Sequence, residues 1–434
     1  MSLVVSALSN NNNNDSCPSS NNKKFTAIVI GGGPAGLAVS LGLGNLESCE
    51  KVYIIEKQPK FDSRGANFLL AYNGVKALEE LSQGIQQDFE SVGVVSYMVP
   101  DYPAILLPWW EMRNVILNRV RTMGNDKIKI YTNKRFTRII ENDDDAGVTV
   151  HFDNDNDELK VLKGDILIGA DGVHSNVRKH LQLKPGTEIG LRTIIRGHVN
   201  NAHEIPQLQP LLSRGLVPIG GNFGGIDGLV TSVFNYDEKL KGKLAWVVGS
   251  IKEFSKGEEG EDDDDDDEDK LDGVATALSI LDPTKASKDQ VDDLNLFRAL
   301  VLHTEKSNVH VFPQGKVMDF SPEVLNQYNG RWGGRGRITL LGDAAHAFPS
   351  SEGQGGSQAF EDAVVLTRLL KEKYYGGQEE TTSFETILEE FEMSRLPRVK
   401  KLHQDQTERF ATKMNGGTNE MWSTEFMKWV FEGV

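Results

Sequence analysis

The stretch FTAIVIGGGPAGLAVSLGLG, residues 25–44, decides the fold of this chain. It begins with an apolar run at residues 25–30, a pattern typical of a buried strand. Gly31, Gly33 and Gly36 follow in the spacing G-x-G-x-x-G, and a helical pattern continues from them. A strand, a glycine turn and a helix in this order favour a parallel α/β sheet whose first turn binds a phosphate group.

Each glycine of this turn has a separate physical role. Gly31 allows the tight turn, Gly33 lets the backbone approach a pyrophosphate, and Gly36 lets the helix pack closely on the strand. Pro34 and Ala35 lie between them at the start of the helix, whose free N–H groups and positive dipole end attract phosphate. We expect all five residues to contact the cofactor.

A second strand pattern, KVYIIE at residues 51–56, ends in Glu56, 20 residues after Gly36. An acid at this distance accepts hydrogen bonds from a ribose, and we include the adjacent Lys57 in the expected site. Both NAD and FAD contain an ADP half. The pattern therefore leaves open a nicotinamide-dependent dehydrogenase and an FAD enzyme, and the alternative without a ligand is a glycine-rich turn with an acid ending a strand.

A later segment repeats the arrangement of strand, acid and helix. DILIGADGVHSNVRKHL, residues 165–181, is an apolar strand that ends in Asp171 and Gly172. Ser175 and Arg178 follow on the first turn of a predicted helix. We expect this strand to join the same sheet.

A third apolar strand, RITLLGD at residues 337–343, ends in Gly342 and Asp343. Three predicted strands therefore end in an acid: Glu56, Asp171 and Asp343. Ligands of open parallel sheets bind at the carboxyl ends of the strands. The three acids can thus share one extended cofactor.

Together, GGGPAGL, GADGVHSNVR and GDAAHAFPSSEGQG resemble, in this order, the three cofactor motifs of the single-component (class A) FAD-dependent monooxygenases typified by para-hydroxybenzoate hydroxylase. WWEMRNVILNRV is similar to the R-x-x-L helix of that family, and FEMSRLPRVKKLHQ is similar to the start of its C-terminal helical region. The resemblance spans about residues 25–412.

The resemblance implies that Asp343 holds the ribityl hydroxyls of FAD and that Arg113 reaches the cofactor from its helix. It also implies that the loop after Pro349 passes close to the isoalloxazine ring. Arg64 and Arg178 are candidates for the nicotinamide groove, with surface ion pairs as the alternative. The further positions that we expect to bind the cofactor are Arg64, Arg113, Asp171, Gly172, Arg178, Gly342, Asp343, Pro349, Gly353, Gly355 and Gly356.

In the family that the chain resembles, NADPH or NADH reduces bound FAD, and the reduced flavin forms a hydroperoxide with O₂. One oxygen atom passes to an aromatic ring or a double bond, and the other leaves as water. This chemistry fits a sequence with no recognisable catalytic triad, metal-ligand cluster or paired carboxylates, because the cofactor carries the reaction. The catalytic residues stay unknown, and we expect no metal.

Two other functions stay open at this point. One keeps the fold and the FAD but epoxidises, desaturates or reduces an isoprenoid-type compound. The other is a degenerate FAD-binding protein with an interaction role, which three near-intact motifs make a poorer match. A disulfide reductase would need a C-x-x-x-x-C motif, and the sequence has none.

We expect an α/β (α+β) fold with three parts. A Rossmann-like FAD-binding domain with a parallel sheet is interleaved with a mostly antiparallel β-sheet substrate domain, and helices follow at the C-terminus. LRTIIRGHV, LVTSVFNY and KLAWVVGSI are the strand patterns of the second sheet. The predicted boundaries are 25–57, 111–181 and 331–375 for the FAD-binding domain, 58–110 and 182–330 for the substrate domain with a disordered acidic insertion at 256–272, 376–434 for the C-terminal helices and 1–24 for a disordered tail.

Composition sets broad limits on the class of protein. A chain of 434 residues with 38% hydrophobic content can build more than one domain. Much of the net charge of −16 is local, since residues 258–269 contain 11 acids and no base, and this acidity argues against nucleic-acid binding. Cys17 and Cys49 suggest no disulfide framework. We expect a cytoplasmic protein without a transmembrane segment, or an organellar one if the Ser/Asn-rich N-terminus is a leader; the expected partners are a small organic substrate and O₂.

Overall fold

The computed structural model places part of the chain, and the account below concerns that part. It describes residues 24–61, 67–97, 99–142, 147–153, 159–184, 187–188, 193–213, 230–235, 242–250, 272–286, 288, 290–313, 316–348, 354–375, 382–414 and 422–433.

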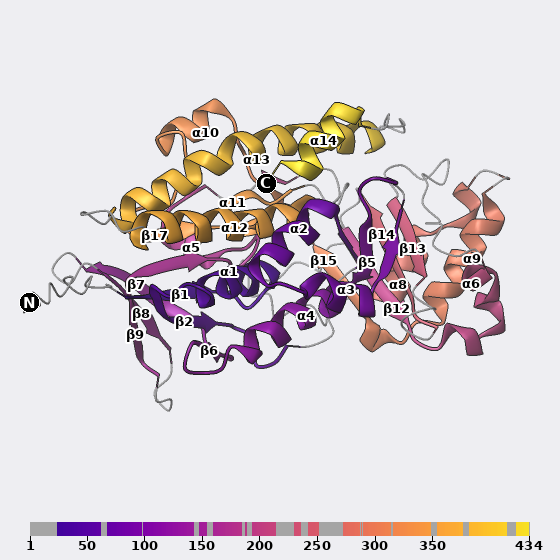
Figure 1. Ribbon diagram of the computed structural model, residues 1–434. Coiled ribbons are helices and arrows are strands. Elements are labelled where there is room, and N and C mark those ends of the chain that lie inside the picture. The colour runs from indigo at the N-terminus through magenta and orange to yellow at the C-terminus, as the bar shows by residue number, and fades with distance from the viewer. Residues whose placement is uncertain are drawn as a thin grey trace, which may run out of the picture.

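A five-stranded parallel sheet forms the centre of the larger body of the molecule (Figure 1). Each neighbouring pair in the order β17-β10-β1-β2-β6 is parallel, so strands distant in sequence lie side by side and all carboxyl ends meet at one edge. Its strands are apolar and largely buried, as parallel strands are when both faces are covered. They are β1 (Phe25–Ile30), β2 (Cys49–Ile55), β6 (Ile128–Tyr131), β10 (Ile166–Gly169) and β17 (Ile338–Leu340).

Helices α1 (Pro34–Gly44), α4 (Trp109–Thr122) and α12 (Gln354–Tyr375) pack beside one another in the core of this body. Helix α1 approaches α12 very closely, because a Cβ atom added to Gly42 would lie 2.2 Å from Oγ1 of Thr367. A small residue at this crossing therefore sets the distance between the two helices.

Helix α12 places its apolar side chains on one buried face. Ala359, Ala363, Leu366 and Leu370 are all buried, as the helical spacing predicts. Helix α13 (Phe384–Met414) packs along α12 and forms the upper layer in Figure 1.

A second, antiparallel sheet lies at the other end of the molecule in Figure 1. It contains the three predicted strands β12 (Thr193–Val199), β13 (Val230–Asn235) and β14 (Leu244–Ser250), together with β15 (Val309–Pro313). Trp246 of this sheet is buried with apolar side chains of nearby helices in a separate core. The predicted α/β class with parallel and antiparallel sheets and C-terminal helices is confirmed.

A small antiparallel sheet of β3 (Asn67–Leu70), β4 (Val94–Ser96) and β5 (Ala104–Pro108) lies between the two larger sheets. Leu107 belongs to the core around the parallel sheet, whereas Leu106 packs in a cluster with Ala245 of β14. Successive residues of β5 thus face the two bodies in turn. The division of the chain into domains stays a prediction.

The remaining elements complete the layers. Strands β7 (Phe136–Asn142) and β8 (Gly147–Phe152) pair antiparallel. No helix in the described ranges combines the length and the apolar composition needed to cross a membrane. The other elements are α2 (Tyr72–Leu81), α3 (Ile85–Val92), β7 (Phe136–Asn142), β8 (Gly147–Phe152), β9 (Val161–Gly164), α5 (Asn176–His180), β11 (Thr187–Glu188), η1 (Ala202–Glu204), η2 (Pro206–Leu208), α6 (Gln209–Ser213), α8 (Gly273–Ile280), η4 (Pro283–Lys285), α9 (Val291–Leu302), η5 (Lys306–Asn308), β16 (Lys316–Val317), α10 (Pro322–Gln327), α11 (Asp343–His346) and α14 (Thr424–Glu432).

Candidate cofactor site

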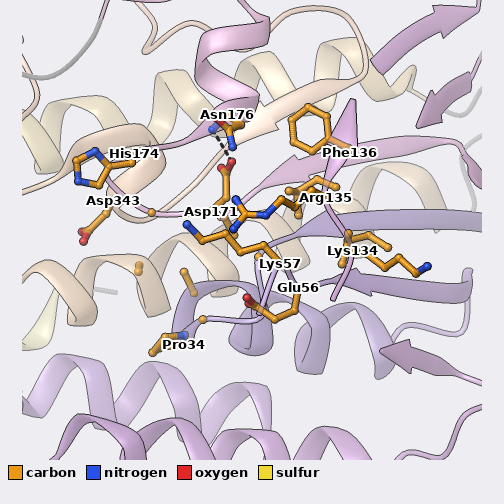
Figure 2. A pocket seen from close by; sticks show the side chains of 18 of the residues that line it. Pro34, Glu56, Lys57, Lys134, Arg135, Phe136, Asp171, His174, Asn176 and Asp343 are labelled. Atoms are coloured by element: carbon orange, nitrogen blue, oxygen red, sulfur yellow. Dashed lines mark hydrogen bonds between the residues drawn. The ribbon is translucent and has the colours of Figure 1, made fainter. Parts of the chain in front are cut away.

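A cavity of about 320 Å³ lies at the carboxyl ends of the parallel strands. Glu56, Asp171 and Asp343 all line it, although more than 100 residues of sequence separate each from the next. Figure 2 shows Asp343 and His174 toward one end of the cavity and Lys134 toward the other. The three acids that the sequence places at strand ends therefore meet at one elongated site.

The glycine turn after β1 has no room for larger residues. Gly31 has a φ of 110°, and a Cβ atom there would lie 2.3 Å from the carbonyl oxygen of Ala170. A Cβ atom on Gly36 would lie 2.0 Å from the carbonyl oxygen of Gly31. Gly33 differs, because an added Cβ atom would meet no protein atom within 4 Å. Since Gly33 lines the cavity, its missing side chain leaves the backbone open to a ligand.

Helix α1 begins at this turn with its N-terminus at the cavity. Pro34 and Ala35 line the cavity, and Gly33 caps the helix without a side-chain hydrogen bond. The first turn contains no acidic residue to neutralise the positive end of the helix dipole. The free N–H groups and the dipole of α1 therefore suit an anionic group such as a pyrophosphate.

Glu56 fixes the glycine turn to the end of β2. Its Oε2 atom accepts a hydrogen bond of 2.8 Å from the backbone N–H of Gly32, and its Oε1 atom accepts one of 2.8 Å from that of Gln58. Lys57 follows it in the cavity wall. The carboxylate thus holds the turn in place and still borders the cavity.

Basic and aromatic side chains between the end of β6 and the start of β7 complete this end of the site. Lys134, Arg135 and Phe136 line the cavity next to Glu56 (Figure 2). We did not predict them from the sequence, because they match no motif. The available signal is their position directly after an edge strand of the parallel sheet, where a ligand site is expected.

Asp171 is largely engaged by its own loop. Its Oδ1 atom accepts a hydrogen bond of 2.5 Å from Oγ of Ser175, and its Oδ2 atom accepts one of 2.7 Å from the N–H of Asn176. Burial raises the pKa of Asp171, and these hydrogen bonds oppose the rise. Gly172 and Asn176 also line the cavity. The acid therefore shapes the wall by holding the start of α5.

Asp343 has the most available carboxylate of the three. No hydrogen-bond donor of the described chain contacts it, and the side chain is accessible from the cavity. The surrounding protein displaces water and raises its pKa, and His346 opposes that rise. Gly342, just before it, has a φ of 59°, a value that favours glycine. An acceptor with no partner among the described residues suits the hydroxyl groups of a ligand.

The N-terminus of α12 borders the same end of the cavity as Asp343. Gly355 and Gly356 line the cavity, and a Cβ atom on Gly355 would lie 3.9 Å from Oδ1 of Asp343. The three predicted positions Arg64, Pro349 and Gly353 lie outside the described residues.

Two predicted arginines lie behind the wall of the cavity. The guanidinium carbon of Arg113 is 5.0 Å from the ring centroid of Trp109, which itself lines the cavity. Arg178 donates hydrogen bonds to the carbonyl oxygens of Lys184 at 2.8 Å and Ala344 at 3.3 Å. Arg178 therefore joins two segments and does not face the cavity. The predicted positions that do line it are Gly31, Gly33, Pro34, Ala35, Glu56, Lys57, Asp171, Gly172, Asp343, Gly355 and Gly356.

A parallel sheet, a glycine turn at a helix N-terminus and acids at three strand ends define a dinucleotide-binding protein. The glycine turn of the cavity and the acids that line it on both sides fit a cofactor with a pyrophosphate at its centre and hydroxyl groups on both sides.

Comparisons with known proteins identify this cofactor. Residues 280–406 match a family model described as an FAD binding domain. The FAD-dependent monooxygenase janM of Penicillium janthinellum is 24% identical over 79% of this chain and 67% of its own length. The FAD-dependent urate hydroxylase of Klebsiella oxytoca is 27% identical over 86% of both chains. The chain is an FAD-dependent monooxygenase, as the three motifs predict, and FAD is its cofactor.

Solved structures show the same fold. CtdE in complex with FAD and a substrate superimposes with a TM-score of 0.70 at 17% identity, over 94% of this chain and 95% of that one. The tetrameric form of 2-methyl-3-hydroxypyridine-5-carboxylic acid oxygenase gives a TM-score of 0.64 at 20% identity, over 94% and 96% of the two chains.

Proposed function

We propose that this protein uses NAD(P)H and O₂ to hydroxylate a small aromatic or otherwise unsaturated compound, with FAD held in the cavity at the strand ends. The observation that carries the proposal is the meeting of Glu56, Asp171 and Asp343 in one cavity with the glycine turn of α1. Two relatives support the choice of substrate class, since one is named a 6-methylsalicylate 1-monooxygenase and the other a urate hydroxylase.

The polar groups of the cavity set a direction for the cofactor. We place the adenosine ribose beside Glu56 and the pyrophosphate at the N-terminus of α1, where Gly33 leaves room for it. Asp343, toward the other end, then accepts hydrogen bonds from the ribityl hydroxyl groups. Gly355 and Gly356 border the isoalloxazine ring in this arrangement.

Bound FAD supplies the transfer of electrons from NAD(P)H and the activation of O₂. The chain contributes position and environment. The positive end of the 22-residue helix α12 stabilises negative charge near Gly355. The Asp343 carboxylate fixes the ribityl chain, and the apolar parts of the wall, such as Ile30 and Ala359, exclude water from the cofactor.

The nicotinamide donor needs no second dinucleotide domain, because one G-x-G-x-x-G fingerprint serves FAD and the donor visits only for reduction. We further propose a cytoplasmic location, since the two cysteines of the sequence offer no disulfide framework.

The first test is the visible absorption spectrum of the purified protein without air, before and after addition of NADPH or NADH. Flavin bands that bleach are expected. Salicylates, urate and hydroxypyridine carboxylates are then screened for faster NAD(P)H oxidation, and mass spectrometry detects incorporation of ¹⁸O from ¹⁸O₂ into the product. A protein that is reduced but oxygenates no compound of a broad aromatic panel would contradict the proposed substrate class, and a protein unable to take up FAD would contradict the site.

A further inference from the structure

A buried carboxylate behind the cavity holds the turn that carries Asp343. Asp362 of α12 has no exposed surface. Its Oδ2 atom accepts a hydrogen bond of 3.0 Å from the backbone N–H of Gly342 and lies 2.6 Å from Nε2 of His346. Its Oδ1 atom accepts a hydrogen bond of 2.8 Å from Nε of Arg395. One side chain thus joins α12, α13 and the turn after β17.

The two residues that Asp362 holds on this turn lie on either side of Asp343. Gly342 precedes it directly, and His346 ends the short helix α11 that Asp343 begins. The backbone of Gly342 has φ 59° and ψ −144°, a conformation outside the regions that other residues favour. Such a backbone persists only where its surroundings fix it. The Asp362 carboxylate fixes the N–H group of Gly342 from the protein interior, and the backbone N–H groups of Ala345 and His346 bind its carbonyl oxygen.

The charges around Asp362 keep it ionised. Burial acts to raise the pKa of Asp362, but His346 and Arg395 lower it to about 2. Arg395 is also buried and forms a second ion pair, with Nη1 3.0 Å from Oε2 of Glu361. A buried acid with three good donors is a strong acceptor, because the low dielectric of the interior strengthens each contact.

We propose that Asp362 is a positioning residue for FAD: by holding Gly342 and His346, it sets the turn so that the carboxylate of Asp343 is presented to the ribityl chain. The inference rests on the proposed function, in which Asp343 accepts hydrogen bonds from FAD. Asp362 itself lies behind the turn and does not line the cavity.

The neighbouring Glu361 is a matched control. It is also fully buried and also binds Arg395. Its other polar contacts are Arg398, with Nε at 2.6 Å, and Asn73, with Nδ2 at 2.6 Å. Among the described contacts it has none with Gly342. Loss of either acid weakens the buried ion cluster, but only loss of Asp362 releases the turn.

In the experiment the full-length holoenzyme is diluted in steps, and the FAD that is released is measured by the rise in flavin fluorescence. The Kd for FAD is derived from this dilution series. Asp362→Asn keeps the shape of the side chain but cannot accept from all three donors. We expect it to weaken FAD binding about tenfold, the effect of one lost hydrogen bond to a charged group. Glu361→Gln leaves the contacts of Asp362 with Gly342 and His346 in place, so it should stay within about twofold of the wild type. Equal effects of the two variants, or unchanged Kd in Asp362→Asn, would overturn the proposal.

A double-mutant cycle separates a positioning role from a general loss of stability. If Asp362 acts through Asp343, Asp362→Asn should change Kd by less than about twofold in an Asp343→Ala background. Full additivity of the two changes would show that Asp362 acts by another route. If Asp343→Ala alone binds FAD normally, the proposed function fails at that residue. If Asp343→Ala loses FAD while Asp362→Asn does not, only the positioning role fails.

A second pair of variants serves if Asp362→Asn does not fold. His346→Leu removes the donor to Asp362, and His346→Gln keeps an N–H group at similar reach. We expect His346→Leu to weaken FAD binding and His346→Gln to restore most of it. Equal FAD affinity in the two variants would overturn the role of the Asp362 contact.

Discussion

Glu392 of α13 should make the stability of the protein depend on pH near neutrality. Its side chain is buried, and its Oε1 atom accepts hydrogen bonds of 3.0 Å from the N–H of Gly334 and 2.8 Å from Oγ1 of Thr339. Burial raises the pKa of Glu392 from 4.5 to about 7, although the contacts with Thr339, Arg331 and Gly334 oppose the rise.

The sign of the effect follows from where the proton is held. Between pH 4.5 and pH 7 the folded protein keeps a proton on Glu392 that the unfolded chain has released. The resulting stabilisation is complete below pH 4.5 and is lost as the pH rises through 7. A shift of this size corresponds to about 3 kcal/mol of unfolding free energy. Glu392→Gln, which is neutral at every pH, should lack this dependence.

The assay is reversible urea unfolding from pH 5 to pH 8.5, with the same excess of FAD in every sample. We subtract the unfolding free energy of Glu392→Gln from that of the wild type at each pH, so that the titration of other groups cancels. This difference should fall by up to about 3 kcal/mol from pH 5 to pH 8.5. Glu408→Gln, a change of the same chemistry at an exposed position of α13, is the control. A difference that stays constant with pH would refute the reasoning.

Three further changes test other parts of the fold. Gly36→Ala brings a Cβ atom to 2.0 Å from the Gly31 carbonyl oxygen, so α1 must shift. The visible absorbance of the purified variant should show little bound flavin, and a normal flavin content would contradict the description of the turn. Leu370→Ala should lower the unfolding free energy by about 2–5 kcal/mol in urea, and a loss below about 1 kcal/mol would mean that this face of α12 is not tightly packed. Arg398→Met removes hydrogen bonds to the last carbonyl groups of α14, so hydrogen exchange in residues 424–432 should accelerate, and unchanged exchange would show that the helix is held by apolar contacts alone.

Local pattern was sufficient to predict the strand ends. Glu56, Asp171 and Asp343 each follow a short apolar run, and a parallel sheet brings such positions to one edge regardless of their distance in sequence. Predicting that the three acids meet did not require the order of the strands, because the carboxyl ends of all parallel strands lie at the same edge of the sheet. The glycine spacing added the position of the phosphate-binding turn.

Contacts between distant helices were beyond the reach of the same patterns. Asp362 appears in the sequence as one polar residue on the buried side of a helix, and its partner Arg395 belongs to a helix that packs on it only in the folded state. Arg178 shows the opposite case. Arg178 belongs to a cofactor motif and lies on the five-residue helix α5. Its guanidinium group donates to backbone carbonyl groups behind the cavity wall and does not reach into the cavity.

The strand order β17-β10-β1 has a consequence for biosynthesis. Strand β1 is made at residue 25, but its sheet neighbour β10 comes at residue 166 and the next strand, β17, at residue 338. Contacts of such long sequence separation form slowly, because the intervening chain must first be closed into a loop. A nascent chain on the ribosome therefore has the glycine turn long before it has Asp343. We therefore expect FAD to join this protein late in translation or after release, because until then the phosphate-binding turn lacks the part of the cavity wall that contains Asp343.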